Sequence, residues 1–66
     1  MKINFDQKHD VIRIKFQEGD YEISKELDDG IIVDMTKDNQ IIAIEILDAS
    51  SRIPKGNLKE FTMNFS

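Results

Sequence analysis

Two groups of side chains in this 66-residue chain have the types and spacing that site chemistry needs. Asp6, His9 and Asp10 lie close together in the sequence, and a histidine flanked by carboxylates can ligate a divalent metal. Their spacing matches no established metal motif, and aspartates that bond the backbone of a turn explain the cluster more simply. We therefore predict an exposed turn here and no metal site.

The second group is a pair of carboxylates, Asp34 and Glu45, in two neighbouring alternating segments. Such a pair does acid–base chemistry if burial keeps one member protonated. The predicted register places both on the outer, solvated face of a sheet, so we interpret them as part of an acidic surface. Asp48 with Ser50 and Ser51 lacks a nucleophile elbow or a second histidine, and we expect Asp48 to cap a helical turn. The chain is therefore predicted not to be an enzyme.

Composition excludes several further function classes. The length predicts a single domain over residues 1–66, and the absence of cysteine excludes disulfides and thiolate metal ligands. The net charge is −4, and residues 1–51 carry six basic against twelve acidic groups, which opposes nucleic-acid binding. No apolar run approaches the roughly 20 residues of a membrane span, and no signal-peptide core is visible. We expect a cytoplasmic protein that binds no membrane and carries no cofactor.

Apolar and polar residues alternate with a period of two along most of the chain, which indicates half-buried antiparallel strands. Turns predicted at residues 8–9, 18–19, 28–30 and 38–39 agree on one apolar face. They predict that Leu27 pairs with Ile31, and that Met35 pairs with Ile23 on one side and with Ile42 on the other. The predicted fold is mainly β: an antiparallel meander of five to six strands paired in the order one to five, rolled or packed as a dimer. One short helical turn is expected near residues 48–53. The predicted apolar face consists of Ile3, Phe5, Ile12, Ile14, Phe16, Ile23, Leu27, Ile31, Val33, Met35, Ile42, Ile44 and Ile46.

Four further apolar residues are predicted on the opposite, outer face: Ile32, Ile41, Ala43 and Leu47. An uncovered patch of this kind promotes aggregation, so a partner or the C-terminal segment must cover it. In that segment the alternation of Phe61, Met63 and Phe65 favours a sixth strand, and a short amphipathic helix starting at Asn57 is the alternative. We expect a homodimer in which this segment crosses to the neighbouring subunit and buries on the order of 1,200 Å² in total.

The chain resembles a short bacterial and archaeal family of unknown function, DUF2283. The resemblance rests above all on residues 44–50, with the sequence IEILDAS, and on residues 28–34, DDGIIVD. The alternating strand 11–16, Phe5-Asp6 and Asp10 also contribute. It covers a core of about residues 3–53 and leaves residues 54–66 as a C-terminal extension. The chain departs from the family pattern at Arg13, where an aromatic or apolar residue is usual, and at Asn39, where glycine is frequent. The resemblance implies a small β-rich domain without an established activity.

These observations predict a non-enzymatic protein-interaction or regulatory module, antitoxin-like in one version, that self-associates and docks a basic protein. The predicted partner-binding residues are Asp28, Asp29, Ile32, Asp34, Ile41, Ala43, Glu45 and Asp48. The alternative is a β domain that holds a small ligand or a metal in a curled sheet.

Overall fold

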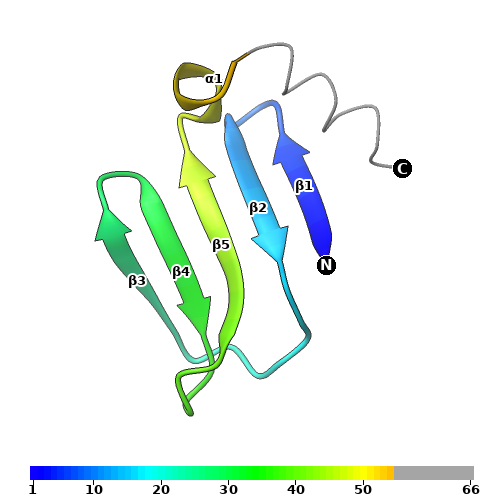
Figure 1. Ribbon diagram of the computed structural model, residues 1–66, viewed down its shortest axis with the longest axis vertical. Coiled ribbons are helices and arrows are strands. Elements are labelled where there is room, and N and C mark those ends of the chain that lie inside the picture. Colours follow the sequence, from blue (N-terminus) through cyan, green and yellow to red (C-terminus); the bar gives the residue numbers. More distant parts are fainter. Residues whose placement is uncertain (55–66) are drawn as a thin grey trace.

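The described residues, 1–54, form one sheet of five antiparallel strands with a short helix at one end in the computed structural model (Figure 1). The strands are β1 (Lys2–Asp6), β2 (Val11–Lys15), β3 (Ile23–Asp28), β4 (Ile31–Met35) and β5 (Ile41–Leu47), and the helix is α1 (Ala49–Arg52). The mainly β fold and the helical turn near residues 48–53 are confirmed. The sixth strand, its helical alternative and the crossing to a second subunit concern residues outside the described part.

The order of the strands in the sheet is β1-β2-β5-β4-β3. The meander connections are confirmed from β1 to β2 and from β3 through β4 to β5. The hairpin expected at Glu18-Gly19 is wrong, and with it the order one to five, because β2 pairs with β5 instead of β3. The segment from Phe16 to Glu22 crosses one end of the sheet to reach its far edge (Figure 1). All six residues of β3 are exposed, so this polar strand occupies an edge while the apolar β5 occupies the centre.

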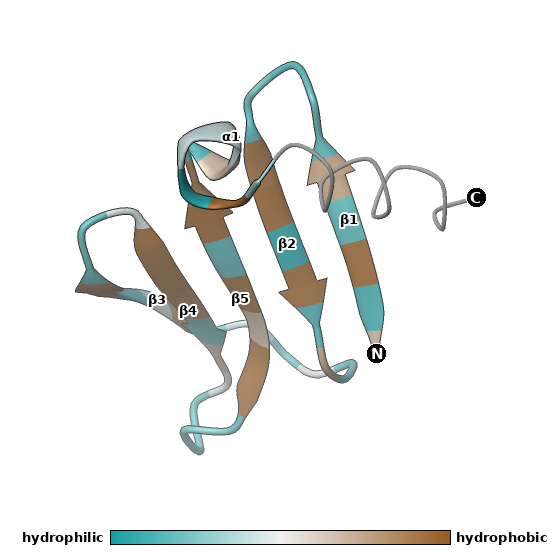
Figure 2. Ribbon diagram, turned by 45° about the horizontal axis from the view of Figure 1, so that its top comes forward, coloured by the Kyte–Doolittle hydropathy of each residue, from teal (hydrophilic) through white to brown (hydrophobic). Residues whose placement is uncertain are grey.

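The predicted register is confirmed along the central strands. Ile3 lies opposite Ile14 in the pairing of β1 with β2, and Val33 lies opposite Ile44 in the pairing of β4 with β5. The pairing of β2 with β5 adds Ile14 opposite Ile44 to the same face. Figure 2 shows the resulting alternation of hydrophobic and hydrophilic bands along β2 and β5. One face of the sheet is therefore apolar, as the alternation requires.

A β-bulge in β5 changes the predicted pairing near its start. Asp34 pairs with Ala43, but the next residue, Met35, pairs with Ile41, so Ile42 is the extra residue of β5. The predicted pair of Met35 with Ile42 is therefore wrong. Because β5 has one extra residue here, the residues before the bulge point to the opposite faces from those that strict alternation would give them.

The bulge exchanges the predicted faces of Ile41 and Ile42. Ile41 lines an apolar hollow with Phe16 and Ile44, so it lies on the apolar face and not on the outer one. Ile42 turns to the outer face, where the crossing segment covers it and leaves 4% exposed. A Cβ at Gly19 would lie 3.5 Å from Cγ1 of Ile42, which shows how closely the backbone of the crossing segment passes.

A second bulge lies at the end of β3. Asp28 lies opposite Ile31, whereas the turn at residues 28–30 was expected to pair Leu27 with Ile31. Leu27 becomes the extra residue and is 69% exposed. Gly30 has φ of 76°, the left-handed conformation predicted for it, which glycine adopts without steric cost.

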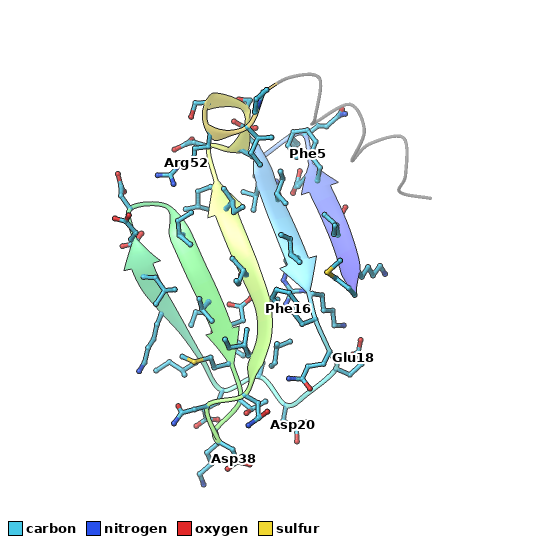
Figure 3. All side chains as sticks on the ribbon, in the orientation of Figure 1. Phe5, Phe16, Glu18, Asp20, Asp38 and Arg52 are labelled. Atoms are coloured by element: carbon cyan, nitrogen blue, oxygen red, sulfur yellow. The ribbon has the colours of Figure 1, made fainter. Side chains whose placement is uncertain are left out.

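The best-buried part of the molecule lies where α1 packs on the apolar face of β2. Ile12 and Ala49 are fully buried and are surrounded by Ile3, Phe5, Ile14, Ile46 and Ile53. Figure 3 shows Phe5 at this end of the sheet, close to α1. The helix covers this end of the apolar face, and Val33 of β4, on the same face, is also buried, with 4% exposed.

The start of α1 is held by Asp10 and not by Asp48. Asp48 has φ of 51° and makes no side-chain capping bond, so the predicted cap is wrong. The carboxylate of Asp10 accepts hydrogen bonds from the backbone N–H of Ser50 at 3.0 Å and from its hydroxyl at 2.6 Å. The carbonyl of Asp10 accepts a third, from the N–H of Ala49, at 3.0 Å. A residue of the β1–β2 turn thus supplies the cap that a local residue usually supplies.

Replacing Ile12 by alanine is expected to destabilise the fold by about 2 to 5 kcal/mol, because it removes a fully buried aliphatic side chain. The free energy of unfolding in urea measures this change. Ile23→Ala is the matched control. Because Ile23 is 45% exposed on an edge strand, this change should lower the free energy of unfolding much less. Equal losses in the two variants would show that the core is placed wrongly.

Replacing Asp10 by alanine is expected to lower the free energy of unfolding by about 1 to 2 kcal/mol, the usual value of a helix cap. Asp10→Asn is the matched control, because asparagine also tolerates the left-handed φ of 58° found here and keeps an acceptor oxygen. Urea unfolding should place the asparagine variant between alanine and wild type. If Asp10→Ala unfolded at the same urea concentration as the wild type, this capping role would be excluded.

Candidate functional site

Polar side chains from four strands meet on the outer face, opposite the core. The pairing of β2 with β5 places Arg13 opposite Glu45, and the pairing of β3 with β4 places Ser24 opposite Asp34. The crossing segment adds Tyr21. Together these five residues line a hollow of about 320 Å³ in the middle of the sheet.

Asp34 is the buried member of this group. It is 3% exposed, and Oδ1 accepts a hydrogen bond of 2.5 Å from the hydroxyl of Ser24. The Oγ of Ser24 also lies 2.9 Å from the hydroxyl of Tyr21. Nη2 of Arg13 approaches Oδ2 of Asp34 to 3.5 Å, a long ion pair. Our interpretation of Asp34 as a solvated surface residue is therefore wrong, and residues of the crossing segment line the hollow beside it.

The pKa shifts of Asp34 and Glu45 point to one proton shared by the pair. Burial raises the pKa of Asp34, but hydrogen bonds from Glu45 and Ser24 and the charge of Arg13 outweigh burial, so the pKa lies below its ordinary value. The hydrogen bond to Asp34 raises the pKa of Glu45, and burial and the negative charge of Asp34 raise it further against the opposing charge of Arg13. A proton bound by the pair therefore resides on Glu45 rather than on Asp34. Such a pair can hold and release a proton above the ordinary range of a glutamate.

The other predicted partner-binding residues are dispersed. Asp28, Asp29 and Asp48 are exposed, and Ala43 is fully buried. Ile32 is half-buried opposite Glu45, as predicted. Of the eight residues, the structure brings Asp34, Glu45, Ala43 and Ile32 together on one face, places the three exposed aspartates outside that group, and moves Ile41 to the apolar face.

Sequence reasoning missed Arg13, Ser24 and Tyr21. The sequence could have predicted Ser24, because the predicted pair of Ile23 with Met35 already places Ser24 opposite Asp34. Arg13 could be assigned to the site only from the pairing of β2 with β5. The opposite charges at positions 13 and 45 are the only signal of that pairing in the sequence.

Asp6, His9 and Asp10, around the first turn, make hydrogen bonds within the chain. Nδ1 of His9 lies 2.8 Å from Oδ2 of Asp6, and the N–H of His9 donates to Oδ1 at 3.1 Å. These hydrogen bonds lower the pKa of Asp6. Asp10 points instead to α1. Within residues 1–54 no three His, Cys, Asp or Glu side chains gather to hold a metal ion.

Fold and site define a small antiparallel β-sheet domain with a carboxyl pair of opposite pKa shifts on one face. The chain belongs to the family described as "Protein of unknown function (DUF2283)", whose model matches residues 2–50, and the resemblance seen in the sequence is confirmed.

A Methanosarcina mazei protein named "Putative hypoxanthine phosphoribosyltransferase" is 47% identical over 51 residues, which are 77% of this chain and 41% of that relative. The chain thus spans about two fifths of the length of the curated relative. No solved structure matches it. In residues 1–54 we find no helix with the length and apolar character needed to cross a membrane.

The shared proton predicts a maximum of stability in mildly acidic solution. Because the pKa of Glu45 is raised by folding, its contribution is complete below the ordinary value of 4.5 and is lost as pH rises through the raised pKa. Because the pKa of Asp34 is lowered, its contribution is present above the ordinary value of 3.8 and is lost as pH falls through the lowered pKa. The urea concentration at the midpoint of unfolding should therefore decrease both below and above this pH range.

The variant Glu45→Gln isolates the contribution of the proton. Its amide donates to Asp34 at every pH, so the difference in midpoint between variant and wild type should shift in favour of the variant as pH rises. Glu22→Gln, at an exposed glutamate, is the control and should follow the wild-type profile. A Glu45→Gln profile parallel to wild type would exclude the shared proton.

Proposed function

We propose that this protein is a small non-enzymatic interaction module that self-associates through the apolar face of its sheet. The observation that carries the proposal is the exposure of large hydrophobic side chains on that face. Phe16, Ile23 and Ile41 are each 45% exposed. A monomer with such a face in water risks aggregation, whereas a partner layer removes it from solvent.

The uncovered region lies at the end of the apolar face away from α1. Phe16, Ile41 and Ile44 line an open hollow of about 500 Å³ there, together with the polar residues Gln17, Asn39 and Gln40. The helix covers only the opposite end, around Ile12. An apolar centre with a polar rim is the usual composition of a protein interface.

A second copy of the chain is the occupant that fits this face. The molecule measures 36 × 27 × 16 Å, so its broad face exceeds the about 600 Å² per partner that a small stable interface needs. Lys25, opposite Val33, and Asp28, opposite Ile31, are charged positions that the register of the edge strand places on this face.

A basic protein partner, in a regulatory and antitoxin-like role, is the second part of the proposal. Asp28, Asp29 and Asp48 are exposed and can meet its cations, whereas Asp34 and Ala43 are buried. Cytoplasmic location belongs to the same proposal and rests on the absence of cysteine.

Light scattering of the full chain at micromolar concentration should give twice the chain mass of 7.7 kDa. Ile41→Lys should shift the mass to that of the monomer, because it places a charge in the centre of the proposed interface. Tyr21→Lys is the matched control, since Tyr21 is 61% exposed but lines the hollow of the opposite face. A soluble monomer of the wild-type chain, or equal effects of the two variants, would overturn self-association through this face.

A further inference from the structure

Three cations of the outer face converge beside the carboxyl pair. In the pairing of β1 with β2, Lys2 lies directly opposite Lys15 and Asn4 lies directly opposite Arg13. These four side chains line a hollow of about 140 Å³. The alternation of both strands places them on one face, so the cluster is built by the sheet itself.

Two lysines directly opposite each other are an unfavourable pair in an antiparallel sheet, because their side chains are close and carry the same charge. Arg13, in the next row, adds a third positive charge. The side chain of Lys15 is only 28% exposed, so its ammonium is partly shielded from water. An anion bound between these groups would be attracted by all three cations and would offset their mutual repulsion.

A carboxylate of the chain already approaches the cluster from outside. Glu18, in the crossing segment, forms an ion pair with Nζ of Lys15, although its side chain is 88% exposed. The hydrogen bond from Lys15 lowers the pKa of Glu18, and the charges of Lys15, Lys2 and Arg13 lower it further. All three cations therefore act on one carboxylate that is held only at the surface.

We propose that Lys2, Asn4, Arg13 and Lys15 form a binding site for a phosphate group, and that Glu18 is an internal carboxylate that competes with this ligand. The two ammonium groups neutralise the dianion, the guanidinium binds two of its oxygens, and the amide of Asn4 donates to a third. Arg13 has donors available for this, since its ion pair with Asp34 is long, at 3.5 Å.

The size of the hollow sets the class of ligand. A volume of about 140 Å³ is below that of a pocket for a drug-sized molecule, about 300 Å³ or more. The site therefore takes inorganic phosphate or the terminal phosphate of a larger molecule that remains outside. It does not depend on self-association, because it lies on the opposite face from the proposed interface.

Titration with inorganic phosphate at neutral pH and constant ionic strength, followed by the backbone amide resonances in NMR, tests the site. We expect saturable shifts confined to β1, β2 and the crossing segment. Lys2→Ala and Lys15→Ala should each weaken binding by about threefold to tenfold, and Glu18→Gln should tighten it by a few-fold, because one charge-assisted contact is lost or one competitor removed. Chloride at equal ionic strength should give no saturable shift.

Two control variants have the same charge changes elsewhere. Lys25→Ala, on the edge strand, and Glu22→Gln, at an exposed position, should bind phosphate as wild type does. The amide spectra themselves report whether each variant is folded. Shifts spread over the whole chain, equal weakening by Lys2→Ala and Lys25→Ala, or weaker binding by Glu18→Gln would overturn the proposal.

Discussion

The pairing of β2 with β5 is the interaction on which the rest of this structure depends. It places Ile12 against Ile46 in the core and, one residue further along, Arg13 against Glu45 on the outer face. Because the two faces of a strand alternate strictly, one register sets both the packing under α1 and the position of the cation beside the carboxyl pair. A shift by one residue would expose the isoleucine and bury the ion pair.

The sequence predicts those parts of the fold that follow from local turns. The hairpin register from β1 to β2 is correct, and so is that of β4 with β5 from Ile31 to Asp34, since loop length and alternation fix them. Alternation states which face a residue takes, however, and not which strand lies beside it, so Ile14 is equally compatible with Ile23 and with Ile44. The bulge was invisible for a related reason: Ile41 and Ile42 are the same residue type, and exchanging their faces leaves the hydrophobic pattern unchanged.

The candidate site was predictable only in part. Local register places Asp34 diagonal to Glu45, and it also implies the contact with Ser24. The burial of Asp34 depends on the path of the crossing segment, which no local rule supplies. On the finished sheet Arg13 lines both outer hollows, so the cation that stabilises the ionised Asp34 also belongs to the cluster of lysines. Lys15 lines both hollows as well, so the acidic and the basic part of the outer face meet at Arg13 and Lys15.

The strand order also has a consequence for the order of folding. β1 with β2, and β3 with β4 and β5, are joined by short loops, and closing a short loop costs less chain entropy than bringing β2 to β5. We therefore expect the β1–β2 hairpin and the β3–β4–β5 meander to form first and to meet in the last step, linked only by residues 16–22. At high concentration β2 can meet β5 of another molecule, which preserves every strand pair of the sheet. Exchange of the β1–β2 hairpin between two chains is thus the characteristic assembly error of this topology.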